Sequence, residues 1–191
     1  MKGGPKYRVP HRRRREGKTD YRTRLKLLKS GLPRFVVRRS NRNILCQVIE
    51  HRTEGDIVIT SAHSCQLKQF GWKAACGNIP AAYLVGLLVG KRAKEKGIKR
   101  GILDTGLYDN VKGARIYAVL KGILDAGIAI PHSPEILPSE ERLRGEHIAK
   151  WAEKMKTEPE KYKRYFSEYL HSMKPEDIVS HFNSVKERIM K

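Results

Sequence analysis

The stretch that decides the fold is residues 34–60, RFVVRRSNRNILCQVIEHRTEGDIVIT. Three runs within it, 35–37, 44–49 and 56–60, are rich in β-branched and other apolar residues and are separated by polar segments. Runs of this composition predict an antiparallel meander of three short strands. The first turn is unusual, because residues 38–43 are consecutive polar residues that include three arginines and two asparagines. We interpret this turn as a binding edge, and a surface turn that is merely basic is the alternative.

Helical and extended patterns alternate after the meander. Apolar residues recur at helical spacing in residues 80–96 and 113–126, and a glycine follows each segment as a stop signal. Residues 101–104 and 128–130 are short apolar runs that predict two further strands. This order of elements predicts an α/β sandwich with a mixed sheet.

After Pro138 the sequence pattern is helical throughout. Ser139 and the two glutamates after it predict the start of a helix, residues 157–160 have the form of a capping box, and Pro175 begins a last helix. The predicted apolar stripes of these helices are Ile148, Trp151, Ala152 and Met155, then Tyr162, Tyr165, Phe166 and Tyr169, then Ile178, Phe182, Val185 and Ile189. We interpret the stripes as packing faces that cover the sandwich or a neighbouring protein.

Positive charge is concentrated at the N-terminus. The first 42 residues hold 16 of the 40 lysines and arginines and only two acidic residues, so they carry +14 of the formal net charge of +20. Tyrosine and histidine rings lie among these cations, a composition typical of segments that stack on bases and contact phosphates. Residues 1–33 therefore predict a basic arm that follows nucleic acid, with a short helix over 19–29 that turns Leu25 and Leu28 inward. A solvated basic tail is the alternative.

Composition also argues against several other classes of protein. The longest apolar run, residues 79–89, is about half of a membrane span, and no apolar stretch follows the basic N-terminus as it would in a secretory signal. The three cysteines form no C-x-x-C pair, which favours buried thiols in a reducing compartment over disulfides. We expect a soluble intracellular protein with no metal, no cofactor and no membrane partner. It divides into the arm, an α/β domain over 34–137 and a helical extension over 138–191.

Short motifs resemble known signatures but lack essential parts. Residues 86–92 have one residue too few between the glycines of a phosphate loop, and residues 63–65 have no further cysteine at zinc-finger spacing. Asp104 precedes Thr and Gly as in an aspartic protease, but no second copy exists. Two alternatives stay open. One is a metal-dependent RNA-processing nuclease that uses Asp56, Asp104 and Asp109, and the other is an RNA chaperone without selectivity.

A longer set of motifs carries a resemblance to a known family. The set is RSNRNI at 39–44, QV at 47–48, AHS at 62–64, FGW at 70–72, NIPAAYL at 78–84, GILD at 101–104, GAR at 113–115, LKGILDAG at 120–127 and IPH at 130–132. In this order the motifs resemble the universal large-subunit ribosomal protein that binds 5S rRNA, which is numbered eighteen in the archaeal series and five in the eukaryotic one. The helical extension resembles the archaeal and eukaryotic branch, and its short length favours the archaeal form.

This resemblance implies both a fold and a role. The fold is a mixed-sheet sandwich of the translational-machinery type, with an extended basic N-terminal arm and a helical C-terminal extension. The role is structural and not enzymatic. In the large subunit of cytoplasmic ribosomes, such a protein binds 5S rRNA and attaches it to the large-subunit rRNA in the central protuberance. It works there beside a second 5S-binding protein and other large-subunit proteins.

The resemblance and the charge pattern together give a set of residues expected to bind RNA. They are Lys2, Lys6, Tyr7, Arg8, His11, Arg12, Arg13, Arg14, Arg15, Lys18, Tyr21, Arg22, Arg24, Lys26, Lys29, Arg38, Arg39, Ser40, Asn41, Arg42, Asn43, His63, Ser64, Lys68, Trp72, Lys73, Lys112, Arg115 and His132. The arm would follow the contour of a folded RNA and order on binding, and the turn at 38–43 would fix the register.

Overall fold

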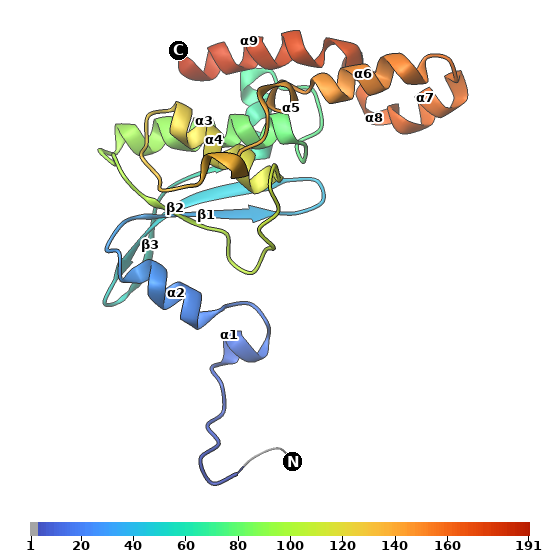
Figure 1. Cartoon of the computed structure of the whole chain (residues 1–191). Coiled ribbons are helices and arrows are strands. Elements are labelled where there is room, and N and C mark those ends of the chain that lie inside the picture. Colours follow the sequence, from blue (N-terminus) through green and yellow to red (C-terminus); the bar gives the residue numbers. More distant parts are fainter. Residues whose placement is uncertain (1–3) are drawn as a thin grey trace.

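The structure, a computed structural model, describes residues 4–191, so that Lys2 lies outside the described residues (Figure 1). The strands are β1 (Arg34–Arg39), β2 (Ile44–Arg52), β3 (Gly55–His63) and β4 (Ile102–Asp104). They form a mixed sheet in the order β3-β2-β1-β4, in which β4 runs parallel to β1 and the other neighbours are antiparallel. The predicted meander and the predicted α/β fold with a mixed sheet are confirmed.

The helices surround this sheet and extend beyond it. The α-helices are α1 (Arg12–Arg15), α2 (Tyr21–Leu28), α3 (Ile79–Glu95), α4 (Arg115–Asp125), α5 (Glu140–Arg144), α6 (Glu146–Met155), α7 (Pro159–Tyr165), α8 (Ser167–Leu170) and α9 (Ile178–Met190). Short 3₁₀ segments are η1 (Ser64–Phe70), η2 (Pro134–Ile136) and η3 (Pro175–Asp177). None of the helices within residues 4–191 combines the length and the apolar character needed to cross a bilayer.

One face of the sheet packs against α3 and α4, and α2 lies on the other side (Figure 1). Strand register places Phe35 opposite Val48 and Val37 opposite Cys46, and all four side chains are buried in the core with these helices. Because successive side chains of a strand point to opposite faces, the residues that alternate with them, beginning at Arg34, point to the face that carries the arm.

Close packing of α3 on α4 depends on glycines. A Cβ atom on Gly86 would clash with the backbone carbonyl of Val119, and one on Gly122 would clash with that of Tyr83. The two backbones therefore touch only because these side chains are absent. The segment 86–92 lies within α3, as its apolar periodicity predicts, and its glycines Gly86 and Gly90 lie against α4.

The C-terminal extension shares the core of the sheet domain. The predicted stripe of α9, with Ile178, Phe182, Val185 and Ile189, is buried in the same cluster as the strands and α3. The Lys91 ammonium also donates to the backbone carbonyl of Ile189 at 2.9 Å. Of the two alternatives for this stripe, α9 packs onto its own sandwich (Figure 1).

Two predicted local structures are wrong. Residues 128–130 do not form a strand, because the chain there finds a single pairing partner: Ala129 bridges to Arg100, just before β4 begins. The predicted capping box at 157–160 is absent, because the Thr157 hydroxyl donates to the carbonyl of Lys154 at 3.0 Å instead of accepting from the next helix.

Three predicted inward residues are exposed. The exposed fractions of Leu25, Trp151 and Tyr165 are 56%, 47% and 62%. Gly145 adopts φ 86° and ends α5, so α6 starts as a new helix whose phase leaves Trp151 outward. Likewise α7 ends at Tyr165, so the second predicted stripe is divided between two short helices. In α2, Leu28 is half-buried but Leu25 points away from the sheet domain.

Candidate nucleic-acid interface

The arm contains two short helices, α1 and α2, and a side-chain cap fixes the start of α2. The Asp20 carboxylate caps α2, accepting from the hydroxyl of Thr23 at 2.7 Å and from the backbone N–H of Arg22 at 2.9 Å. The pKa of Asp20 is lowered from its usual value. The hydrogen bond from the Thr23 hydroxyl has the largest effect, and the backbone N–H groups of Arg22 and Thr23 add to it. The predicted RNA-binding residues of the arm within residues 4–29 are exposed, apart from Tyr21 and Arg24, which are half-buried.

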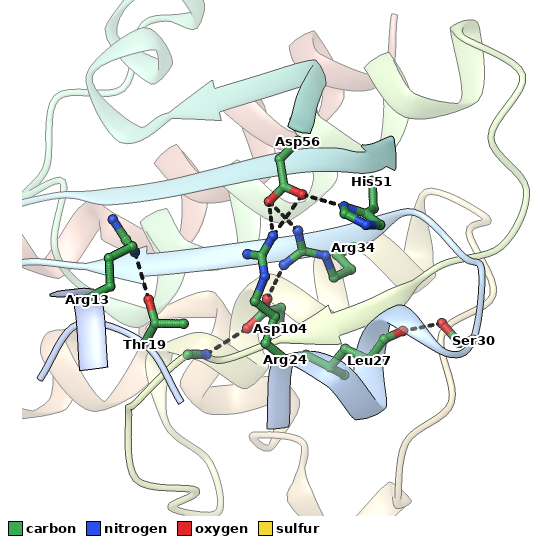
Figure 2. A network of polar contacts seen from close by, with 10 residues as sticks. Arg13, Thr19, Arg24, Leu27, Ser30, Arg34, His51, Asp56 and Asp104 are labelled. Atoms are coloured by element: carbon green, nitrogen blue, oxygen red, sulfur yellow. Dashed lines mark hydrogen bonds and ion pairs between the residues drawn. The ribbon is translucent and has the colours of Figure 1, made fainter. Parts of the chain in front are cut away.

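A cluster of ion pairs ties the arm to the sheet (Figure 2). Arg34, only 2% exposed, donates from Nη1 to Asp104 at 2.8 Å and from Nη2 to Asp56 at 2.6 Å. Arg24 of α2 donates from Nη2 to both oxygens of Asp56, at 2.9 and 2.8 Å, and His51 lies 3.1 Å from the same carboxylate. We call the contact between Arg24 and Asp56 the arm clasp.

Charge in this cluster is compensated internally. Burial alone would raise the pKa of Asp56, but hydrogen bonds from Arg24, His51 and Arg34 outweigh it and lower the pKa to about 2. Asp104 accepts from Arg34 and also from the backbone N–H of Gly106 at 3.0 Å. Two of the three carboxylates weighed for a nuclease, Asp56 and Asp104, are thus engaged by guanidinium groups. Within residues 4–191, no three His, Cys, Asp or Glu side chains come together as a metal site.

The turn between β1 and β2 is held by hydrogen bonds inside and below it. The backbone N–H of Ser40 donates to the carbonyl of Asn43 at 2.8 Å, and the N–H of Asn43 donates back to the Ser40 hydroxyl at 2.9 Å. From below, Arg115 Nη1 donates to the carbonyls of Ser40 at 3.2 Å and Gly77 at 2.7 Å. A Cβ atom on Gly77 would clash with the carbonyl oxygen of Asn41, so the backbone of the turn is in direct contact with the backbone at Gly77.

One cation of this turn, Arg39, is held by an aromatic ring and not by a carboxylate. The Arg39 guanidinium lies 4.9 Å from the ring centre of Tyr108, whose hydroxyl donates to the Arg39 carbonyl at 2.8 Å. Burial first, and then the positive charge of Arg39, lower the pKa of Arg115. Arg38, Arg42 and Asn41 are exposed at the same end of the sheet. Cations held this close favour the approach of an anion such as phosphate.

The arm and the sheet meet at a cavity of about 580 Å³ on the face of the sheet that carries the arm. Its lining includes Arg13, Lys18 and Arg24 from the arm and Arg38 from β1. The loop 104–108 contributes another part of the lining. The structure therefore brings predicted residues from two distant parts of the sequence to one groove.

Two residues that were predicted to contact RNA, Ser64 and Trp72, are buried inside the fold. Ser64 is 0% exposed, and its hydroxyl accepts from the N–H of Ile44 and donates to Asn43 Oδ1, each at 3.1 Å. Trp72 is 2% exposed, its indole N–H donates to the carbonyl of Ala75, and its ring stacks on His181 of α9. Neither side chain is available to RNA, because each is used to join parts of the fold.

Arg115 and Asn43 also have internal roles. The Arg115 guanidinium donates to backbone carbonyls of the turn and of Gly77. Asn43 Oδ1 accepts from the Ser64 hydroxyl and from the Cys65 thiol. They shape the turn and are half-buried. We therefore assign them to the support of the interface.

The other predicted contacts lie outside the cavity lining. His63 is half-buried, and its Nδ1 accepts from the N–H of Cys65. Lys112 pairs with Glu135 at 2.9 Å. The exposed Lys68, Lys73 and His132 are not part of the cavity lining either. Their contact with RNA stays a prediction.

Sequence reasoning does not single out Arg34 and Tyr108. Arg34 begins an apolar strand at a position that alternates with the core residues, which is a signal that it points to the other face. Its partners Asp56 and Asp104 come from β3 and β4, and only the strand order brings all three together. Tyr108 lies in a loop, and no sequence pattern links it to Arg39.

One comparison with known proteins bears on this interface. A family model described as "Ribosomal large subunit proteins 60S L5, and 50S L18" matches residues 5–99 and 93–133. The matched residues include the described arm from residue 5 onward, the sheet, α3, α4 and the whole lining of the cavity. The helices α5 to α9 lie outside the match.

Proposed function

We propose that this chain, which belongs to the family of ribosomal large subunit proteins 60S L5 and 50S L18, binds 5S rRNA and helps attach it to the large-subunit rRNA in the central protuberance. Membership makes it a ribosomal protein of the large subunit that binds rRNA and serves translation. The choice of 5S rRNA, the cytoplasmic location and a neighbouring second 5S-binding protein are parts of the proposal.

The observation that carries this proposal is the convergence of the arm and the sheet on one groove. Arg13, Lys18 and Arg24 reach the cavity from one side, and Arg38 reaches it from the end of β1. A folded RNA presents phosphates on several sides of a compact body, so cations that surround a groove suit it better than cations along one line.

The two parts divide the work of recognition. The exposed cations of the arm contribute affinity that depends on salt, because each phosphate they neutralise releases counterions. The backbone of the turn at 38–43 is held by Arg115, Gly77 and Tyr108, so Asn41 and Arg42 extend from a fixed loop. A fixed turn can select one RNA surface, because it loses little conformational entropy on binding.

The role is structural in this proposal, and the paired carboxylates support that view. A metal site for RNA cleavage needs carboxylate oxygens that are free to bind the ion. Asp56 and Asp104 instead accept from Arg34, and Asp56 also accepts from Arg24.

A competition experiment tests the proposal. Labelled 5S rRNA is bound to the purified protein at moderate ionic strength and challenged with unlabelled 5S rRNA or with tRNA. We expect 5S rRNA to compete at least tenfold better, because the fixed turn and the shaped groove select one fold. Footprinting of the same complex should then show one continuous protected surface.

Two results would favour the alternatives. Equal competition by tRNA would identify a chaperone without selectivity. Cleavage of RNA in Mg²⁺ that disappears in Asp104→Asn would identify the nuclease.

A further inference from the structure

The cavity between the arm and the sheet contains more than cations. Its floor is apolar, since Val36 and Ile49 line it and are each 8% exposed. Leu107 and Tyr108 of the 104–108 loop stand beside this floor and also line the cavity. Phosphate contacts do not require apolar surface, so this part of the cavity calls for a different ligand group.

The size and the composition fit one nucleotide. The volume of about 580 Å³ lies within the range of small-molecule sites, which is roughly 300–1,000 Å³. An unstacked base needs an apolar or aromatic surface for its face and hydrogen-bonding groups for its edge. Thr19, Thr23 and Thr105 contribute hydroxyl groups to the lining. The Asp56 carboxylate of the arm clasp also lines the cavity.

The cations of the lining suit the phosphate of that nucleotide. Among residues 4–191, Arg13 and Arg38 make no ion pair, although both line the cavity. Arg13 keeps its orientation through a hydrogen bond from Nε to the Thr19 hydroxyl at 2.9 Å, which leaves its terminal nitrogens for other acceptors. These two cations come from different elements, Arg13 from α1 and Arg38 from β1.

We propose that this cavity takes one unstacked nucleotide of the bound RNA, with its base over Val36 and Ile49 and its phosphate toward Arg13 and Arg38. This inference rests on the proposed function for the identity of the RNA. It adds a defined pocket to a surface that is otherwise rich in exposed cations. Capture of a single base would position the RNA to within one nucleotide.

Filling the cavity tests the inference without changing charge. Val36→Phe adds volume at the floor, and Leu107→Trp adds it at an exposed wall where folding is less at risk. We expect each variant to bind 5S rRNA about tenfold more weakly, with the slope of affinity against salt unchanged, because a base contact and no phosphate contact is lost. Val111→Phe is the matched control, since Val111 is 60% exposed and does not line the cavity.

The outcomes separate this inference from the proposed function. If the wild-type protein shows no preference for 5S rRNA over tRNA, the proposed function fails. If that preference holds and both folded cavity variants bind as tightly as Val111→Phe, the pocket alone is overturned. Circular dichroism of each variant shows whether it is folded.

Crosslinking locates the base directly. 5S rRNA carrying 4-thiouridine at one single-stranded position at a time is bound, irradiated and digested with trypsin. We expect one position to crosslink to the peptide 101–112, which contains Leu107 and Tyr108. Crosslinks confined to other peptides would overturn the pocket.

Free mononucleotides distinguish the source of the ligand. AMP, CMP, GMP and UMP share the chemistry of the proposed ligand but lack the rest of the RNA. We expect only millimolar binding, because most of the affinity comes from the phosphates along the arm. Micromolar binding of any of the four would show that the cavity serves a free nucleotide and would overturn its assignment to RNA.

Discussion

The arm and the turn at 38–43 are both positively charged, but they are held in opposite ways. The ion-paired contact of the arm with the sheet domain is the clasp between Arg24 and Asp56. The turn is held by Arg115, by close backbone contact with Gly77 and by the hydroxyl of Tyr108. A loosely held cation can adjust to an RNA surface, whereas a fixed cation can reject a wrong one. The comparison therefore separates affinity from selectivity.

Removing the arm should have the largest effect on binding. Deletion of residues 1–29 removes 12 of the 40 lysines and arginines. We expect the affinity for 5S rRNA to fall by a factor of about 1,000 or more and its dependence on salt to flatten, because fewer counterions are released. Filter binding at several salt concentrations measures both quantities.

A full-length variant with Arg12–Arg15 changed to glutamine serves as the intermediate case for this deletion. Its affinity and its salt slope should lie between those of the wild type and the deletion. An affinity that survives the deletion unchanged would place the main contacts on the sheet domain and reverse the comparison.

Changing a glycine to alanine should lower the free energy of unfolding much more in the packed core than in the arm. Gly86→Ala places a methyl group against the carbonyl of Val119, so we expect the free energy of unfolding to fall by about 3 kcal/mol. Gly4→Ala meets no atom within 4 Å and should change it by less than about 0.5 kcal/mol. Urea denaturation measures both values. Similar values for the two variants would mean that α3 can move away from α4.

The turn should contribute selectivity more than affinity. We expect Arg39→Ala combined with Arg42→Ala to cost about 2 kcal/mol in binding 5S rRNA, the range of charge-assisted hydrogen bonds, and little in binding unrelated RNA. The matched control is Lys96→Ala with Lys99→Ala, which removes the same charge from exposed positions outside the turn. Equal losses on both RNAs would show that the turn acts as plain charge.

The elements of the α/β domain could be predicted because local signals and long-range packing agree there. The run 35–37 alternates around buried Phe35 and Val37, and the polar turn after it leaves one register for β2. The stripe of α9 has the same consistency, since four residues at helical spacing are all buried. The prediction for the part of the extension before α9 was wrong at Trp151. Gly145 ends α5 there and starts a new helix whose phase turns Trp151 outward.

The candidate site could be predicted only in part, because burial of single side chains depends on distant partners. Ser64 is polar and comes after the predicted strand 56–60, yet its hydroxyl is bonded to Asn43 and Ile44, about twenty positions earlier. Trp72 is covered by His181, which lies more than a hundred positions later. The exposure of the arm's cations was easier to predict, because lysine and arginine side chains are rarely buried in any fold.

The smallest expected effect concerns the arm clasp, and it tests how loosely the arm is held. The pKa of Asp56 is lowered from 3.8 to about 2. A carboxyl whose pKa is lower in the folded state stabilises that state above its unfolded pKa. The contribution of Asp56 is therefore complete above pH 4 and is lost as the pH falls from about 4 to about 2.

Arg24→Gln should weaken the clasp without unfolding the protein, since an exposed or half-exposed ion pair contributes less than about 1 kcal/mol at neutral pH. The carbon-13 signal of the Asp56 carboxyl should then titrate with a midpoint above about 2 but below 3.8, because Arg34 and His51 still donate to it. Arg22→Gln removes the same charge from an exposed position of α2 and should leave the midpoint unchanged. A midpoint that moves equally in both variants would mean that Asp56 senses the total charge of the arm and not one guanidinium. The arm would then be attracted to the sheet as a whole, and the clasp would not determine where α2 lies.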